Sequence, residues 1–269
     1  MSKITTIQWV IDEMEAWAPT FWAEEDDNVG LLIGNAQNSI KKILVAIDAT
    51  DAVVQEAIAG GYNCIITHHP LTYTPLKRIT ADCTIGRKIL AMAKHDISLY
   101  SAHTNLDKAP GGVNDCLAEK LGISNTIPLV KDAFGDDIGF GRIGELPTGI
   151  TLRELAVHVK KSLDLKDIRY SGDLSRKIKK VAICGGSGMS FWRSASDTNC
   201  DVYITGDAKY SDALSALASG LCLLDITHYS GENIIIEAIV ERLRTKAEQD
   251  DISLKINATT VNGQAFYAL

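Results

Sequence analysis

The sequence contains no long apolar run, no paired-cysteine motif and no large basic cluster. No stretch approaches the roughly 18 uninterrupted apolar residues that a membrane-spanning helix needs. The six cysteines are scattered and form no Cys-x-x-Cys pair, which argues against a disulfide framework and against a zinc finger. The chain begins Met1-Ser2-Lys3-Ile4 and shows no apolar leader sequence. We therefore expect a reduced, cytoplasmic protein that is not associated with a membrane.

Charge and length set two further limits. The net charge is −7, and the longest basic stretch is Arg176-Lys177-Ile178-Lys179-Lys180. Because binding to duplex nucleic acid needs a basic face, nucleic acid is not an expected partner. We interpret the short basic stretch as a solvated strand edge in preference to a charge patch. With 269 residues, of which 46% are hydrophobic, the chain suits one large or two modest globular domains.

The spacing of apolar residues predicts an α/β fold. Ile4, Ile7, Ile11 and Met14 recur at helical spacing, which predicts an amphipathic helix over residues 3–17. Strand-like and helix-like segments then alternate, which is typical of βαβ units. The predicted strands cover residues 42–47, 63–67, 97–101, 167–171, 179–184, 201–205, 221–226 and 252–257. The predicted helices cover 51–59, 84–94, 112–121, 189–197, 208–219 and 230–246, and one more opens at the capping box Thr151-x-x-Glu154.

A change in composition indicates two lobes. Residues 128–151 are interpreted as loops and short strands, because turn-forming residues gather there. We predict a two-lobed α/β protein with mixed, largely parallel sheets flanked by helices. The first lobe comprises residues 1–127 and 220–269 and carries the metal ligands described below, and the second comprises residues 128–219. The metal site is expected in the cleft between the lobes.

Four of the six histidines lie in three compact motifs, each of which follows a predicted strand. Ligands of open α/β sheets bind beyond the carboxyl ends of the strands, so three loops could converge on one site. A single His-x-x-x-Asp pattern is more often an ordinary core or surface feature, but the three motifs together favour a metal site that holds two ions. The motifs are His68-His69-Pro70, His103-x-x-x-Asp107 and His228-x-x-x-Glu232.

The residue types indicate which metals suit the site. Successive side chains of a strand point to opposite faces, so His68 and His69 at a strand end could each bind a different ion. If a helix begins at Tyr229, His228 and Glu232 project to the same side of its first turn. Imidazole and carboxylate ligands suit Zn²⁺, Mn²⁺, Fe²⁺, Co²⁺ or Ni²⁺, and the absence of cysteine from the motifs disfavours a structural zinc site.

Other polar residues near predicted strand ends are candidates for supporting roles. Asp48 follows a strand, and Tyr73 and His103 are candidate outer hydrogen-bond partners of the ligands. The turn Asp26-Asp27-Asn28-Val29-Gly30 could supply helper polar groups. Cys184-Gly185-Gly186-Ser187-Gly188 is either an anion cradle or a plain tight turn. Asp207 is interpreted as the N-cap of helix 208–219 in preference to a functional residue.

These motifs resemble those of the GTP cyclohydrolase I type 2 homolog family, the Nif-three-like dinuclear-metal proteins, nearly from end to end. The double histidine and the terminal His-x-x-x-Glu are specific in combination. The shared segments are Asp27-Asn-Val-Gly-Leu-Leu-Ile-Gly34, Ile66-Thr-His-His-Pro70, Ala102-His-Thr-Asn-Leu-Asp107, Gly111-Gly-Val-Asn114, Cys184-Gly-Gly-Ser-Gly188, Asp201-x-x-Ile-Thr-Gly-Asp207 and Asp225-x-x-His-x-x-x-Glu232.

The resemblance implies a ligand set and an assembly. It implies that His68, His69, Asp107, His228 and Glu232 bind two divalent metal ions per subunit, and that the subunits form a ring-shaped homohexamer. Relatives that carry an inserted domain between the halves are longer than this chain. Two positions depart from the family pattern, Asp207 where Glu is frequent and Thr227 where Gly is frequent, and both lie outside the ligand set.

The resemblance also implies a reaction, for which the residues leave alternatives. GTP cyclohydrolysis opens the purine ring with water and releases formate, and a dinuclear centre can activate water and polarise the bond attacked. His103 could act as the general acid-base group. A phosphoesterase would use the same residues, and Lys77-Arg78 or the turn 185–188 could hold a phosphate. The third alternative is a metal-binding ring that docks other proteins without turnover. The expected partner is a small-molecule or nucleotide substrate.

Overall fold

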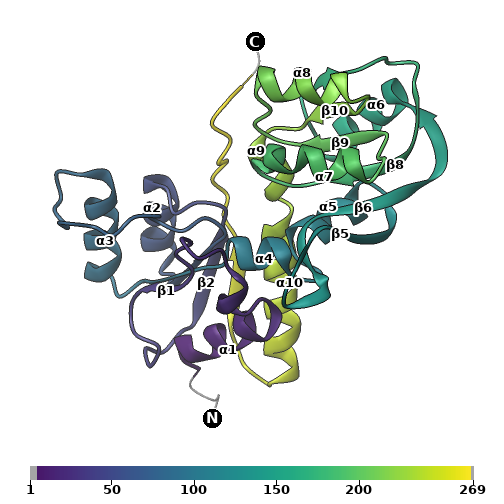
Figure 1. Cartoon of the computed structure of the whole chain (residues 1–269). Helices are drawn as coiled ribbons and strands as arrows, with labels where there is room; N and C mark the ends of the chain where they lie inside the picture. The colour runs from purple at the N-terminus through teal and green to yellow at the C-terminus, as the bar shows by residue number, and fades with distance from the viewer. Residues whose placement is uncertain (1–4, 268–269) are drawn as a thin grey trace. The chain divides into compact units, whose positions relative to one another are not determined.

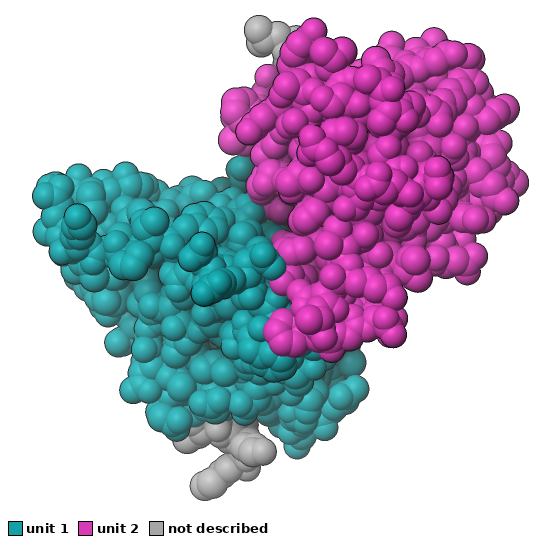
Figure 2. All heavy atoms as spheres, viewed as in Figure 1, with its two compact units in different colours: residues 1–106, 235–263 teal, residues 107–234, 264–269 magenta. Residues whose placement is uncertain are grey.

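The computed structural model describes residues 5–267, which form a mixed α/β structure with two sheets flanked by helices (Figure 1). The predicted fold class is confirmed. The chain divides into two compact units (Figure 2). Each unit contains one sheet. Unit 1 comprises residues 1–106 and 235–263, and unit 2 comprises residues 107–234 and 264–269. No helix within residues 5–267 is long and apolar enough to cross a membrane.

Unit 1 is built on a five-stranded sheet in the order β1-β4-β3-β2-β11. Strands β4, β3, β2 and β11 run parallel, and β1 is an antiparallel edge strand. The strands are β1 Gly30–Ile33, β2 Lys42–Ala46, β3 Cys64–Thr67, β4 Ser98–Ser101 and β11 Lys255–Ala258. The helices are α1 Ile7–Trp17, η1 Thr20–Trp22, α2 Asp51–Gly60, α3 Thr84–Lys94 and α10 Ile235–Gln249.

The inner strands β3 and β4 of the unit 1 sheet are buried. All four residues of β3 and all four of β4 are buried, as expected for strands in the interior of a parallel sheet. Helix α2 contributes Val53, Val54 and Ala57 to a core shared with Ile65 and Leu99 of these strands. Because β2, β3 and β4 are adjacent and parallel, the residues that follow them emerge at one edge of the sheet.

Unit 2 is built on a six-stranded sheet in the order β5-β6-β8-β9-β10-β7. Strands β8, β9 and β10 are adjacent and parallel, whereas β5, β6 and β7 pair antiparallel. The strands are β5 Ser124–Asp132, β6 Gly135–Thr151, β7 Arg169–Ser171, β8 Lys177–Ile183, β9 Val202–Thr205 and β10 Cys222–Asp225. The other elements are α5 Val113–Lys120, α6 Leu152–Ser162, η2 Gly188–Phe191, α7 Trp192–Asp197, α8 Tyr210–Ala218 and α9 His228–Glu232. Helix α4, Thr104–Lys108, spans the division between the units.

Most predicted elements occur at the predicted places, and two predictions were wrong. Helix α1 begins at Ile7, and residues 3 and 4 of its predicted range lie outside the described residues. Residues 128–151 were predicted as loops and short strands, but apart from the turn at 133–134 they belong to the long antiparallel strands β5 and β6. Glycine in this hairpin permits close approach of strands: Gly141 has a φ of +61°, and a Cβ there would lie 2.6 Å from the carbonyl oxygen of Ile183. The predicted helix 230–246 is two helices, α9 and α10.

The boundaries of the two observed units differ from those of the two predicted lobes. Residues 107–127, 220–234 and 264–269, which were predicted in the first lobe, belong to unit 2. For the first two segments the physical reason is apolar burial, because their Leu117 and Leu224 share one core with Leu155 and Val181. As a result, His68 and His69 lie in unit 1, whereas Asp107, His228 and Glu232 lie in unit 2.

Candidate metal centre

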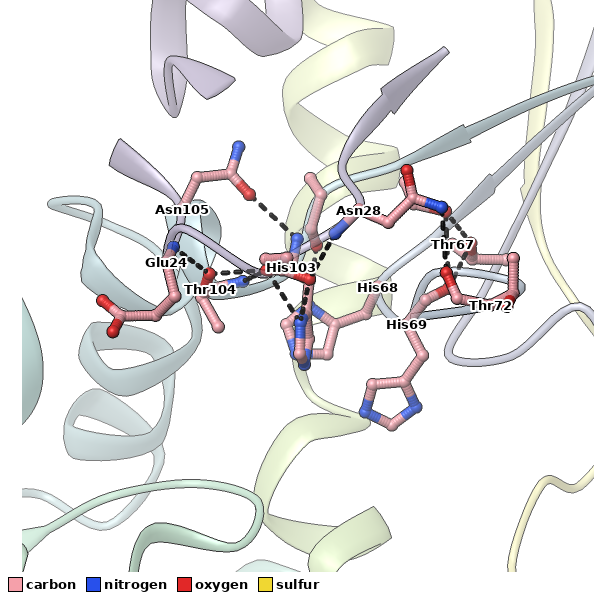
Figure 3. A network of polar contacts seen from close by, with 12 residues as sticks. Glu24, Asn28, Thr67, His68, His69, Thr72, His103, Thr104 and Asn105 are labelled. Atoms are coloured by element: carbon pink, nitrogen blue, oxygen red, sulfur yellow. Dashed lines mark hydrogen bonds and ion pairs between the residues drawn. The ribbon is translucent and has the colours of Figure 1, made fainter. Parts of the chain in front are cut away.

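Three histidines gather at the carboxyl edge of the unit 1 sheet. His68 and His69 follow β3 directly, and His103 follows the neighbouring strand β4. The ring centroids lie 5.1 Å apart for His68 and His69, 5.2 Å for His68 and His103, and 5.5 Å for His69 and His103 (Figure 3). One potential ligand atom from each ring lies within 4.8 Å of those of the other two. This group could therefore hold a metal ion.

The Nδ1 atom of each of these rings meets an oxygen. His68 Nδ1 lies 2.8 Å from the carbonyl oxygen of Ala102, and His69 Nδ1 lies 2.9 Å from Oδ1 of Asp48. His103 Nδ1 lies 2.9 Å from Oδ2 of Asp27. A carbonyl or carboxylate oxygen accepts a hydrogen bond, so each contact favours the tautomer with a proton on Nδ1 and a lone pair on Nε2. Such an outer partner is typical of histidines that bind a metal through Nε2.

Asp27 is the most strongly held of these oxygen partners. Burial by itself would raise its pKa, but hydrogen bonds from His103 and Thr104 outweigh burial and hold the pKa well below the usual range. The Thr104 amide and hydroxyl donate to Oδ2 at 3.1 and 2.5 Å, and the Asn28 amide donates to Oδ1 at 2.9 Å. Asp27 therefore stays ionised and orients His103. The turn containing Asp27 was predicted to supply helper groups, whereas the role of Thr104 was missed.

Two further side chains predicted as outer partners lie beside this group. Asp48, which follows β2, contacts His69 as described above. The Tyr73 ring lies edge-on to the His103 ring, with centroids 5.7 Å apart and an interplanar angle of 62°. Tyr73 is 54% exposed, so it borders the histidine group on the solvent side.

Unit 2 carries a second set of potential ligands, at the carboxyl edge of its own parallel strands. His228 and Glu232 are the first and last residues of α9, with His228 Nε2 lying 3.1 Å from Oε2 of Glu232. Glu232 is buried. His228 Nδ1 lies 2.9 Å from Oδ2 of Asp207, which follows the adjacent strand β9. His228 thus has the same kind of oxygen partner at Nδ1 as the unit 1 histidines.

The prediction that Asp207 caps helix α8 was wrong. The helix begins at Tyr210, and Lys209 occupies the N-cap position. Asp207 has a φ of +53°, a left-handed conformation that Asp tolerates better than most residues, and its carboxylate contacts His228 instead. Asp207 follows strand β9, and His228 follows β10, the neighbouring strand of the same sheet. The position of the Asp207 carboxylate after a predicted strand was the signal in the sequence.

The glycine turn after β8 lets α9 approach the sheet closely. A Cβ on Gly185 would lie 2.7 Å from the carbonyl oxygen of Gly231, and a Cβ on Gly186 would collide with the Glu232 carboxylate. The Gly185 amide donates to Oδ1 of Asn114 at 3.0 Å, so this N–H does not serve an anion. The close packing favours the interpretation of residues 185–188 as a tight turn over that as an anion cradle. It also explains why glycine is needed at positions 185 and 186.

Asp107 lies four residues after His103 on α4, the helix that spans the division between the units. Its carbonyl oxygen accepts a hydrogen bond from Nδ2 of Asn114 at 3.0 Å. Asn114 therefore braces both Asp107 and the glycine turn, a role that was not assigned from the sequence although Asn114 belongs to one of the shared motifs.

The donor atoms offered by the two sets are nitrogen and oxygen. Burial raises the pKa of the Cys64 thiol to about 12 and that of the Cys116 thiol to about 11, which keeps both protonated at neutral pH. Imidazole and carboxylate groups bind divalent transition metals, and the residues present fit such ions.

Comparison with known proteins gives a family for the chain. The model of the Duf34/NIF3 (NGG1p interacting factor 3) family matches residues 5–264, and the chain belongs to this family. A Clostridium perfringens relative called GTP cyclohydrolase 1 type 2 homolog is 40% identical over 241 residues, covering 90% of this chain and 92% of the relative. The resemblance inferred from the motifs is therefore confirmed.

Other relatives agree in length or in fold. A Bacillus subtilis protein of the same name is 28% identical over an alignment of 371 residues that covers 99% of each chain, so it is longer than this chain. The crystal structure of a Bacillus cereus protein related to NIF3 superposes with a TM-score of 0.95 at 29% identity and covers 100% of both chains.

Replacing Gly186 by Ala should lower the free energy of unfolding more than replacing Gly122 by Ala. Both glycines have left-handed backbone conformations, with φ of +64° and +69°, so both variants incur about 1–2 kcal/mol from the conformation. Only at Gly186 does the new Cβ meet the Glu232 carboxylate, whereas at Gly122 nothing lies within 4 Å. Urea unfolding of both variants in the presence of a chelator measures the difference. Equal losses would show that the glycine turn does not constrain Glu232.

The stabilisation from Asp27 should depend on pH. Because the folded-state pKa of Asp27 lies below the ordinary value of 3.8, its contribution is fully present above that value and is lost as the pH falls through the depressed pKa. Asp27→Asn should therefore destabilise the protein more at pH 7 than at pH 3. Urea unfolding at the two pH values tests this, with Asp12→Asn on the exposed side of α1 as the control. A pH-independent difference between wild type and Asp27→Asn would contradict it.

Proposed function

We propose that this protein binds two divalent metal ions per subunit through His68, His69, Asp107, His228 and Glu232. The observation that carries the proposal is the oxygen partner at Nδ1 of His68 and of His69, since each favours a lone pair on Nε2. His228 also has an oxygen partner at Nδ1, and its Nε2 lies beside the Glu232 carboxylate, the other proposed ligand of α9. The family resemblance implies the same five residues. His103, which directly precedes α4, and Asp107 on α4 connect the two sets of ligands along the chain.

The proposed activity is metal-dependent hydrolysis of a nucleotide-like substrate. Bound divalent ions would supply Lewis acidity for the attack of water on a polar bond. His103 is the proposed general acid-base residue: its Nδ1 is held by Asp27, so its Nε2 can accept a proton or, once protonated, return it. Asp27 orients the ring and stabilises the positive charge that His103 acquires. The support for this role is the partly buried Asp–His pair beside the other two histidines.

GTP ring opening with release of formate is the first candidate reaction, because the relatives carry that name. Phosphoester hydrolysis is the second, since a pair of ions can stabilise both the attacking and the leaving oxygen. A ring of six copies, implied by the resemblance, is part of the proposal. If such a ring binds metal without turnover, it acts as a metal-binding or docking protein.

Loss of the adjacent histidines should remove metal without unfolding the chain. The double variant His68→Ala/His69→Ala should retain less than half of the metal of the wild-type protein, because each ring is a proposed ligand of one ion. Glu232→Gln should also lower the metal content. Metal per chain is measured by elemental analysis of the purified proteins, and circular dichroism verifies their folding.

His95→Ala is the matched control, because His95 is exposed at the C-terminal end of α3 and belongs to none of the three motifs. It should keep the wild-type stoichiometry. Full retention of two ions by the double variant would refute the ligand assignment.

His103→Gln should lower hydrolysis about 10²–10⁴-fold if His103 is the acid-base residue, while leaving the metal content near that of wild type. Two assays on the metal-loaded protein separate the candidate reactions: formate release from GTP, and phosphate or nitrophenol release from model esters. His158→Gln is the control, since the His158 ring contacts the carbonyl oxygen of Leu121 away from the motifs. If the wild-type protein, fully loaded with metal, gives only background rates in both assays, the protein is not a hydrolase of these substrates. The remaining alternative is then a metal-binding or docking protein.

A further inference from the structure

The chain between β3 and α3 forms an exposed segment next to the histidine group. Residues 73–82 are all exposed, and they begin four residues after His69. The part of interest here is residues 73–79, Tyr-Thr-Pro-Leu-Lys-Arg-Ile, which we name the 73–79 segment. None of the proposed metal ligands or acid-base residues lies in it.

The 73–79 segment is held at both ends and unsupported between them. At one end Asn28 Nδ2 donates to the carbonyl oxygen of Thr72 at 2.9 Å, and the Thr72 hydroxyl donates to the carbonyl oxygen of Thr74 at 2.8 Å (Figure 3). At the other end the Thr80 backbone packs against Gly86 of α3, where a Cβ would lie 2.6 Å from the Thr80 nitrogen. Within the described chain, residues 75–79 make no hydrogen bond or ion pair.

The composition of the segment is unusual for an unsupported loop. Tyr73, Leu76 and Ile79 are 54%, 37% and 49% exposed, so three large apolar side chains at three-residue spacing face solvent. Between Leu76 and Ile79 stand two exposed cations, Lys77 and Arg78, in a protein of net charge −7. Neighbouring exposed apolar groups commonly mark a binding surface. Together with the cations, they suit a ligand that has both an apolar face and negative charge.

Tyr73 connects the segment to the candidate metal centre. Its ring lies beside the His103 ring, and Asn28, which holds the neighbouring Thr72, also donates its amide to Asp27. The backbone at Tyr73 and the acid-base pair are therefore fixed by the same residue. The cations lie four and five residues further along the chain, on the part without internal support.

We propose that the 73–79 segment is a substrate-binding element for a phosphorylated planar heterocycle, a nucleotide in chemical class. Tyr73 stacks on the ring of the ligand, and Lys77 and Arg78 close over its phosphates. Base–aromatic stacking and phosphate neutralisation are separate contributions, so they can be removed one at a time. This inference rests on the proposed function, because it assigns a substrate class to the same site.

Calorimetric titration of the metal-loaded, full-length protein with GTP, guanosine and tripolyphosphate separates the two contributions. Tyr73→Ala should weaken GTP and guanosine about tenfold, the size expected for one lost stacking contact, and should leave tripolyphosphate unchanged. Tyr73→Phe should retain wild-type affinities. Lys77→Gln/Arg78→Gln should weaken GTP and tripolyphosphate, flatten their salt dependence and leave guanosine unchanged.

Matched controls lie in unit 2. Tyr210→Ala removes a tyrosine that is 84% exposed on α8, and Lys160→Gln/Lys161→Gln removes two adjacent exposed cations on α6. Neither variant should change any of the three affinities. A second readout uses trypsin, which should cut wild-type protein after Lys77 and Arg78 and should cut there more slowly when GTP is bound.

Several outcomes would overturn the inference. If Tyr73→Ala and Lys77→Gln/Arg78→Gln bind all three probes as the control variants do, the segment does not recognise the ligand. If the variants change the mass in light scattering and leave the GTP affinity unaltered, the segment is a contact between copies of the chain. If wild type binds neither GTP nor guanosine, the substrate class is wrong. Metal stoichiometry and phosphoester hydrolysis, measured separately, then decide whether the proposed function survives.

Discussion

The interaction on which the candidate centre depends is the hydrogen bond from histidine Nδ1 to an oxygen. It recurs at four rings, with Ala102, Asp48, Asp27 and Asp207 as the acceptors. Each bond fixes the orientation of the imidazole, and at His68, His69 and His103 it also favours a lone pair on Nε2. A histidine side chain that rotated freely would lose conformational entropy on binding a metal. In the four histidines held by these bonds, part of that entropy is already lost when the chain folds. The residues around the rings are thus as important as the rings.

In both units, acceptors of these bonds lie just after the carboxyl ends of adjacent parallel strands: Ala102 and Asp48 in unit 1, and Asp207 in unit 2. In unit 1, the adjacent parallel strands β2, β3 and β4 are followed within two residues by Asp48, the histidine pair and His103. In unit 2, the adjacent parallel strands β8, β9 and β10 lead into the glycine turn, Asp207 and α9. Parallel neighbours deliver their carboxyl ends to one edge, so partners distant in sequence meet without long loops. Apolar burial along the strands holds that edge in place.

Close packing then limits which residues can stand next to the ligands. Gly186 leaves room for the Glu232 carboxylate, and Gly185 lies against the backbone of Gly231. Thr227, directly before His228, has a φ of +65° and is held by the Asp225 carboxylate, which accepts its amide hydrogen bond at 2.9 Å. A β-branched residue in this conformation is strained, so the rest of the unit must over-determine it. Glycine at this position would avoid the strain.

The sequence by itself determined the alternating α/β pattern, the three histidine motifs and the family, because periodicity and short motifs are local properties of the chain. It also indicated Asp48 and Asp27 as helpers, since both stand at strand ends or turns. Only the tertiary structure decided that Asp207 holds His228 and does not cap α8, and that residues 128–151 form a hairpin. It also decided that residues 107–127 and 220–234 join unit 2. Those outcomes depend on strand pairing and on a core shared by residues far apart in sequence, which no local pattern contains.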